Sequence, residues 1–159
     1  MEPADAFGLP WAGGCHCGLA RYRVDEAPKF IFACHCTDCQ QLSASAFAIG
    51  MLLPAKGVVW ADCDLAEYAK TADSGVISRQ YSCRACGTWL YTAKDNTPDT
   101  LILRSSSLDA RDWVRPIAEI FTASARPWAR LSTAFSLPGN VEAPERLIAA
   151  FAESDIRPG

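Results

Sequence analysis

The sequence predicts a mainly β domain that ends in one helix. Glycine and proline, ten of each, recur at short intervals along the chain. The runs between them are short and rich in β-branched and aromatic residues, which is typical of strands. Only the C-terminal segment shows the apolar spacing of an amphipathic helix. A chain of 159 residues is long enough for one domain with a modest core.

The strands are expected, in order, at residues 19–24, 30–33, 45–53, 58–60, 65–69, 76–82, 89–92, 100–103 and 117–122. Several of these runs are continuously apolar rather than alternating, which indicates strands that are covered on both faces. The helix is expected at residues 144–154. Pro144 suits its first position, Glu145 suits the positive end of its dipole, and Leu147 and Phe151 share one face. Residues 1–140 therefore form the predicted β domain, and residues 141–159 form a helical extension.

Composition and charge exclude several classes of partner. The formal net charge is −3 and the isoelectric point is near 5.3, so the chain has no general attraction for nucleic acid or for anionic lipid. The N-terminus is acidic and lacks the features of a secretion signal. No apolar run approaches the roughly 20 residues of a membrane-spanning helix. We expect a soluble, cytoplasmic protein, and the sequence carries no signal for an oligomeric state.

The eight cysteines are the most informative residues of the chain. In an oxidising compartment they would suggest four disulfides. A chain without an export signal stays where thiols are kept reduced, and clustered cysteines there bind metal more often. We therefore expect metal sites, with disulfides as the alternative.

Two cysteine pairs, each followed by glycine, form the first group. The four-cysteine cluster consists of Cys15, Cys17, Cys83 and Cys86. Residues i and i+2 of a flat strand stand nearly 7 Å apart, whereas two sulfurs on one zinc lie within about 4.6 Å of each other. The backbone must therefore curl at Cys15 and Cys17, which the flanking glycines permit. This pattern predicts a closed, structural zinc site. Small buried apolar cysteines are the alternative.

The second group, the three-cysteine cluster, consists of Cys34, Cys36 and Cys39. Three protein ligands with an exchangeable fourth position are typical of a reactive zinc. Because three thiolates donate much charge, such a zinc would activate water poorly and would suit a soft fourth ligand such as a thiol. His35 lies between two of the ligands and is expected to point away, although its ligation would close the site.

Two further residues could contribute ligands but are not expected to do so. His16 lies between Cys15 and Cys17, as His35 lies between Cys34 and Cys36, and the same argument applies to it. Cys63 stands alone between Asp62 and Asp64, whose charges disfavour a thiolate. We expect Cys63 to bind no metal.

The cysteine motifs resemble those of the glutathione-dependent formaldehyde-activating enzyme family, which includes centromere protein V. The resemblance covers about residues 11–140. Its motifs are Gly13-Gly14-Cys15-His16-Cys17-Gly18 with Arg21-Tyr22, Cys34-His35-Cys36-Thr37-Asp38-Cys39-Gln40, Cys83-Arg84-Ala85-Cys86-Gly87-Thr88-Trp89-Leu90, and Glu119-Ile120-Phe121-Thr122 followed by Arg126-Pro127-Trp128. Family members often carry histidine where this chain has Glu119, and the helix at residues 144–154 lies beyond the shared core.

The resemblance implies a β-tent fold with two zinc ions, a structural one on the four-cysteine cluster and a catalytic, labile one on the three-cysteine cluster. It also implies a carbon–sulfur lyase activity, the formation or cleavage of S-(hydroxymethyl)glutathione or of another thiol adduct. The expected partner is a small-molecule thiol, glutathione above all, with no nucleic acid and no membrane. Arg126 and Trp128 are the candidates for binding that thiol, since guanidinium pairs with carboxylate. Alternatively, Arg126 is a solvated surface charge and Trp128 is an aromatic residue of the core.

A second function remains open from the sequence. The chain could be a non-catalytic zinc module that supports protein interactions or handles metal. An open coordination position is of no use to a scaffold, so the three-cysteine cluster favours the enzyme. A nucleic-acid-binding zinc ribbon is disfavoured by the acidic composition.

Overall fold

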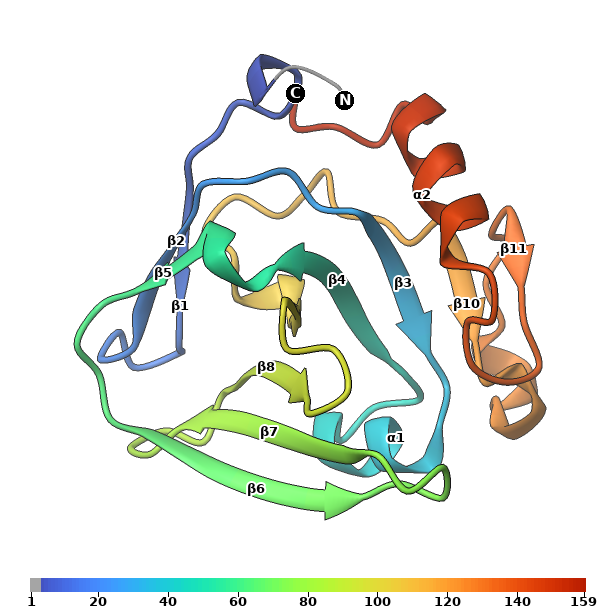
Figure 1. Ribbon diagram of the computed structural model, residues 1–159, viewed down its shortest axis with the longest axis horizontal. Helices are drawn as coiled ribbons and strands as arrows, with labels where there is room; N and C mark the ends of the chain where they lie inside the picture. The colour runs from blue at the N-terminus through green and yellow to red at the C-terminus, as the bar shows by residue number, and fades with distance from the viewer. Residues whose placement is uncertain (1–3) are drawn as a thin grey trace.

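The computed structural model describes residues 4–159, and in these residues the chain forms two sheets and two α-helices (Figure 1). The smaller sheet has the strand order β1-β2-β5, with β1 at Trp11–Gly14, β2 at Arg21–Val24 and β5 at Val58–Trp60. The larger sheet has the order β11-β10-β3-β4-β9-β8-β7-β6. Its strands are β3 Phe30–Cys34, β4 Ala48–Pro54, β6 Leu65–Thr71, β7 Ile77–Cys83, β8 Trp89–Lys94, β9 Thr100–Leu103, β10 Ala118–Ile120 and β11 Phe135–Ser136. The mainly β prediction is confirmed.

The larger sheet is antiparallel from β3 to β6, whereas β10 runs parallel to both β3 and β11. The sheet curls so that the β6–β7 hairpin comes round to the short helix α1, Thr37–Ser43 (Figure 1). An ion pair of 2.5 Å between Lys70 of β6 and Asp38 of α1 closes this curl. The loop after β3, which leads into α1, therefore lies at the same end of the molecule as the β6–β7 hairpin (Figure 1).

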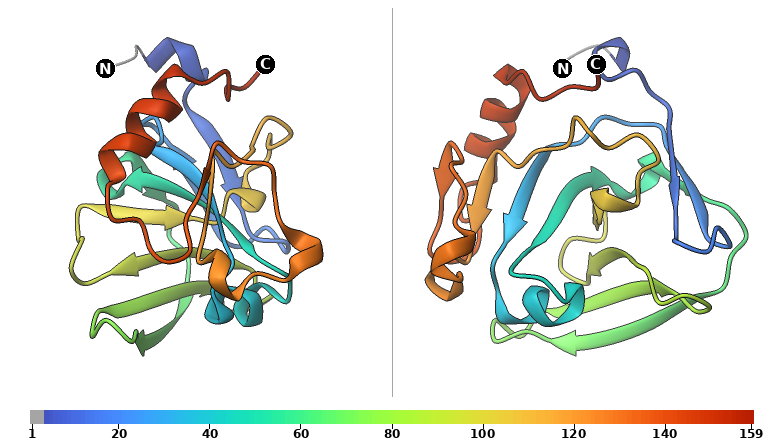
Figure 2. Two further views of the ribbon diagram at one scale, coloured as in Figure 1. Left: turned by 90° about the vertical axis from the view of Figure 1, so that its right-hand side faces the viewer. Right: turned by 180° about the vertical axis from the view of Figure 1, so that it is seen from behind.

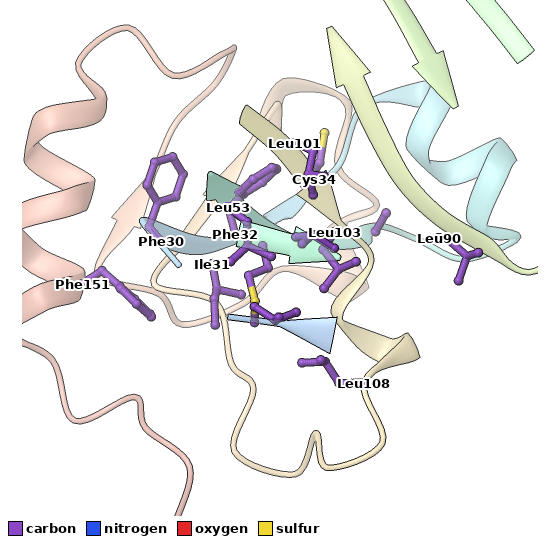
Figure 3. Close-up of a cluster of buried hydrophobic side chains, with 14 of the residues drawn as sticks. Phe30, Ile31, Phe32, Cys34, Leu53, Leu90, Leu101, Leu103, Leu108 and Phe151 are labelled. Carbon is purple, nitrogen blue, oxygen red and sulfur yellow. The ribbon is translucent and has the colours of Figure 1, made fainter. Parts of the chain in front are cut away.

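The core lies on both sides of β3, whose five residues are all buried. This agrees with the expectation that continuously apolar strands are covered on both faces. The second helix α2, Pro144–Glu153, packs against β3 and inserts Leu147 and Phe151 into the core (Figures 2 and 3). The C-terminal segment therefore shares the core of the strands that precede it.

The sequence prediction failed at three elements. The strand β1 and the two-residue strand β11 were not expected, and neither was α1, since only the C-terminal helix was predicted. The side chain of Cys36 caps α1 by accepting a hydrogen bond from the backbone N–H of Cys39. A cysteine is not a usual N-cap residue, so the ordinary signal of a helix start is missing. No helix in residues 4–159 has the length and apolar character needed to span a membrane.

Candidate metal centres

The four-cysteine cluster joins the two sheets. Cys15 and Cys17 lie in the turn between β1 and β2, Cys83 ends β7, and Cys86 lies in the turn before β8. The four sulfurs lie within 4.8 Å of one another, with 3.5 Å between Cys15 and Cys17 and 3.8 Å between Cys17 and Cys83. The edge of a tetrahedron of sulfurs around zinc is about 3.8 Å. The donor set and its spacing therefore fit a closed tetrahedral zinc.

Turns with left-handed glycines shape this cluster. Gly18 and Gly87 have φ angles of 84° and 75°, which residues with a Cβ atom rarely adopt. Thr88 connects the two turns, because its hydroxyl accepts from the backbone N–H of His16 at 3.1 Å and lies 3.2 Å from the sulfur of Cys86. Hydrogen bonds from the side chain and backbone of Thr88 lower the pKa of Cys86 to about 5. A lowered thiol pKa favours the thiolate that metal binding requires.

The three-cysteine cluster lies where β3 passes into α1. Cys34 ends β3, Cys36 caps α1 and Cys39 lies in the first turn of that helix. Their sulfurs lie within 4.8 Å of one another, Cys34 and Cys39 are buried, and Cys36 is half-buried. Hydrogen bonds from the Cys34 and Cys39 thiols lower the pKa of Cys36 to about 2. Three sulfurs at this spacing fit one zinc ion and leave one coordination position for another ligand.

Backbone hydrogen bonds fix the residue between Cys34 and Cys36. The N–H of His35 donates to the carbonyl of Ile120 at 3.0 Å. The carbonyl of His35 accepts from the amide of Gln40 at 2.7 Å and from the hydroxyl of Ser124 at 3.0 Å. The amide of Gln40 also donates to the carbonyl of Ser124. The cysteine loop is therefore tied to the segment that follows β10.

The side chain of His35 contacts Glu119 of β10, with 2.9 Å between Nε2 and Oε2. Both side chains are fully buried. Glu119 also accepts from Arg130, from Ser136 and from the backbone N–H of Leu131. Burial alone would raise the pKa of Glu119, but the hydrogen bonds from Arg130, Leu131 and His35 lower it to about 2. The carboxylate thus joins the cysteine loop to the loop between β10 and β11.

Arg126 and Trp128 lie beside the three-cysteine cluster rather than in it. They line an open cavity of about 590 Å³ whose other wall is α1 and the residues after it: Thr37, Gln40, Gln41, Ala44, Ser45 and Ala46. Thr37 and Gln40 are the immediate neighbours of Cys36 and Cys39 in the sequence. The ring of Trp128 is 80% exposed, so its alternative assignment as a core aromatic is wrong.

One buried residue near the three-cysteine cluster was not expected from the sequence. Arg104, directly after β9, is only 6% exposed. Its guanidinium stacks at 3.6 Å on the ring of Trp89 and donates to the hydroxyl of Thr92 at 2.6 Å. Burial lowers the pKa of Arg104, while the charges of the three cysteines act in the opposite direction. A single arginine after an apolar strand gives no signal in the sequence that its side chain will be buried.

The remaining candidates lie elsewhere. His16 is exposed, Cys63 is half-buried, and neither belongs to a metal-ligating group among residues 4–159. All eight cysteines are free. Arg79 and Arg84 pair with surface carboxylates.

Fold and clusters together define a class, a mainly β protein with two groups of cysteines, one of four and one of three, that could each hold a metal ion. The family model described as glutathione-dependent formaldehyde-activating enzyme matches residues 10–124. The chain therefore belongs to this family. The match ends just before Arg126 and Trp128, short of the expected boundary near residue 140.

A solved structure supports the fold alone. The crystal structure of a Rhodobacter sphaeroides protein, a structural genomics target, aligns with a TM-score of 0.51 at 19% sequence identity. The alignment covers 66% of this chain and 91% of that protein. No curated protein matches the chain.

Proposed function

We propose that this protein is a zinc-dependent carbon–sulfur lyase that acts on a thiol adduct of the S-(hydroxymethyl)glutathione type. The single observation that carries the proposal is the three-cysteine cluster, which offers three sulfurs to an ion. Family membership supports glutathione as the thiol. The four-cysteine cluster would hold a second, structural zinc.

The reaction has a simple balance. Cleavage breaks the carbon–sulfur bond and returns its electron pair to sulfur, while the hydroxyl oxygen loses its proton and forms the carbonyl of formaldehyde. A zinc ion held by Cys34, Cys36 and Cys39 would supply the means to keep the thiol ionised at neutral pH. The reverse direction joins the same thiolate to the carbonyl carbon.

The residues of the chain have distinct parts in this proposal. The open cavity along α1 would receive the peptide part of the thiol, with Arg126 pairing a carboxylate and Trp128 covering the backbone. Gln40 and Ser124 hold the carbonyl of His35 and so keep the cysteine loop in place. Positioning matters here because formaldehyde and thiols also combine without a catalyst, and the enzyme must exceed that rate.

Ligand binding tests the open coordination position directly. Cobalt in place of zinc gives a sulfur-to-metal charge-transfer band, which glutathione should strengthen. Since the thiol loses its proton on binding, its affinity should fall as the pH is lowered, and calorimetry in different buffers should detect the released proton. S-Methylglutathione has nearly the same shape but no ionisable thiol, so it should bind weakly and leave the band unchanged.

Catalysis needs a separate measurement. Exchange between S-(hydroxymethyl)glutathione and formaldehyde can be followed by NMR with and without protein. The proposal requires an exchange rate above the uncatalysed one that disappears in Cys36→Ser. If glutathione and S-methylglutathione bind alike and exchange is not accelerated, the protein is instead a non-catalytic zinc module.

A further inference from the structure

The segment that carries Arg126 and Trp128 is fixed on its N-terminal side to the cysteine loop. The hydroxyl of Ser124 donates to the carbonyl of His35 at 3.0 Å, and the amide of Gln40 donates to the carbonyl of Ser124 at 2.9 Å. His35 lies between two residues of the three-cysteine cluster. The start of the segment is therefore joined directly to that cluster.

The same segment is also fixed on its C-terminal side. Arg130 donates to the carboxylate of Glu119 at 2.8 Å, and the backbone N–H of Leu131 donates to it at 3.1 Å. Glu119 is fully buried. Between the two anchors, the backbone N–H of Ala129 donates to the carbonyl of Arg126 at 2.9 Å and closes a single turn. The backbone of Arg126 is therefore held in place before a ligand binds, which lowers the entropic cost of binding.

Arg126 is the charged residue of the cavity along α1. The other residues that line this cavity are threonine, glutamine, serine, alanine and tryptophan, all of them uncharged. In the part of the chain that the structure describes, Arg126 forms no ion pair. Asp38, which follows the lining residue Thr37, pairs instead with Lys70, and Glu119 is already engaged on the other side of the segment. The cavity therefore offers one available cation and no anion.

The two ends of glutathione differ in what they require from such a cavity. The glycine end is a carboxylate alone, whereas the γ-glutamyl end carries a carboxylate and an ammonium group side by side. A guanidinium pairs with a carboxylate through two parallel N–H bonds. An ammonium group that leaves water needs an acceptor or an anion to replace its solvation. The charge of the lining therefore suits the glycine end and gives the ammonium group no counter-charge.

We propose that the cavity binds the free C-terminal carboxylate of a cysteinylglycine unit, that Arg126 determines this specificity, and that the γ-glutamyl group is not recognised. The substrate class is then a peptide thiol that ends in a carboxylate one residue after its cysteine, and glutathione is one member of this class. The inference rests on the proposed function, which brings the thiol to the three-cysteine cluster. It adds to that function the chemical group by which the thiol is selected.

The experiment compares two pairs of thiols on the cobalt-loaded protein without formaldehyde. The first pair is glutathione and its glycine ethyl ester, and the second is N-acetylcysteinylglycine and its C-terminal amide. Each pair differs by one negative charge far from the sulfur, and the charge-transfer band reports binding. Arg126→Gln is compared with wild type and with Arg84→Gln, a matched control because Arg84 is an exposed arginine that pairs with Asp64. Circular dichroism verifies that each variant is folded.

In wild type, each acid should bind about fivefold or more tightly than its neutral partner, because only the acid pairs with the guanidinium. N-Acetylcysteinylglycine should bind within about threefold of glutathione, since the cavity gives the γ-glutamyl ammonium no counter-charge. Arg126→Gln should reduce the ratio of acid to neutral affinity to about twofold or less, because it removes the cation and keeps a polar side chain. Arg84→Gln should keep the wild-type ratio.

Equal binding of the acid and neutral forms to wild type would overturn the inference, and this comparison needs no variant to fold. A loss beyond the expected range when acetyl replaces the γ-glutamyl group would overturn it too, because that group would then be recognised. A ratio that persists in Arg126→Gln would assign the carboxylate to another residue and contradict the proposal. If glutathione itself leaves the cobalt spectrum unchanged, the proposed function fails and this inference fails with it, so the two failures have different signatures.

Discussion

The Nε2 atom of His35 lies 2.9 Å from Oε2 of Glu119, and neither side chain is exposed to solvent. This contact spans the parallel pair β3 and β10, in which Glu119 lies opposite Ala33. It holds the residue between two ligands of the three-cysteine cluster against the loop that follows β10. Glu119 is thus a buried carboxylate that accepts from four different donors, His35, Arg130, Leu131 and Ser136.

Glu119→Gln should destabilise the protein by about 2 kcal/mol at pH 7, because the amide cannot accept all the charge-assisted hydrogen bonds that the carboxylate accepts. The folded-state pKa of Glu119 is about 2, below its ordinary value of 4.5. Its stabilising contribution is therefore complete above about pH 4.5 and is lost as the pH falls toward 2. Denaturant unfolding of both proteins, with the difference taken at each pH, measures the contribution.

Because both proteins lose zinc in acid, that effect cancels in the difference. Arg115→Gln is a suitable control, since Arg115 pairs with Asp155 on the surface, and exposed pairs contribute little. A difference between wild type and Glu119→Gln that widens below pH 4.5 would contradict the prediction.

Cys83→Ser should damage folding, whereas Cys36→Ser should remove one metal and leave the fold largely intact. Cys83 joins the larger sheet to the turn between β1 and β2, so zinc binding there contributes to folding. Cys36 lies close in the sequence to Cys34 and Cys39, at the junction of β3 and α1, so a metal ion there does not join distant parts of the chain. Circular dichroism and thermal melting, with Cys63→Ser as the control cysteine, test this. Equal destabilisation by Cys83→Ser and Cys36→Ser would mean that the two sites are assigned the wrong way round.

The isolated protein should hold more than one zinc ion but fewer than the two that its clusters can bind, because a closed four-sulfur site retains metal better than an open three-sulfur site. A mild chelator should remove the first equivalent without a change in circular dichroism, and the second only with unfolding. Elemental analysis beside thiol titration gives both quantities. Loss of both ions in one step, together with the fold, would show that the sites are not independent.

Trp128→Ala should weaken glutathione binding several-fold without affecting cobalt uptake, because the exposed Trp128 lines the cavity, whose lining includes none of the three cysteines. Arg126→Gln should also weaken glutathione, and less so at high salt, since it removes a charge pair. Tyr68→Ala is the matched control, an exposed aromatic on β6. Unchanged glutathione affinity in both cavity variants would remove this cavity from the proposed site.

The sequence predicted most strands because hydrophobic burial and turn residues act locally. It did not predict β1, where Gly13 and Gly14 resemble a turn. Gly13 is needed there because a Cβ atom would come within 2.3 Å of the hydroxyl of Tyr22, a contact made only in the folded sheet. Glycines of this kind weaken strand signals for tertiary reasons.

The two cysteine clusters were predictable from the short spacing within each cysteine motif, and the sulfurs of both groups converge as expected. The groups around them were not predictable. Arg104 is buried against Trp89 and Thr92 of the neighbouring strand β8, and Glu119 reaches His35 only through a parallel pairing. Such placements depend on topology, which spacing along the chain does not encode.

During synthesis, the cysteines of one cluster emerge from the ribosome close together, whereas those of the other emerge far apart. Cys34, Cys36 and Cys39 emerge almost together and can capture a metal ion while most of the sheet is still unmade. Cys15 and Cys17 must wait for Cys83, which follows Cys17 by 66 residues, and closing so long a segment is entropically costly until the strands between them pair. The three-cysteine cluster can therefore be complete before the strands that bring the four-cysteine cluster together have formed.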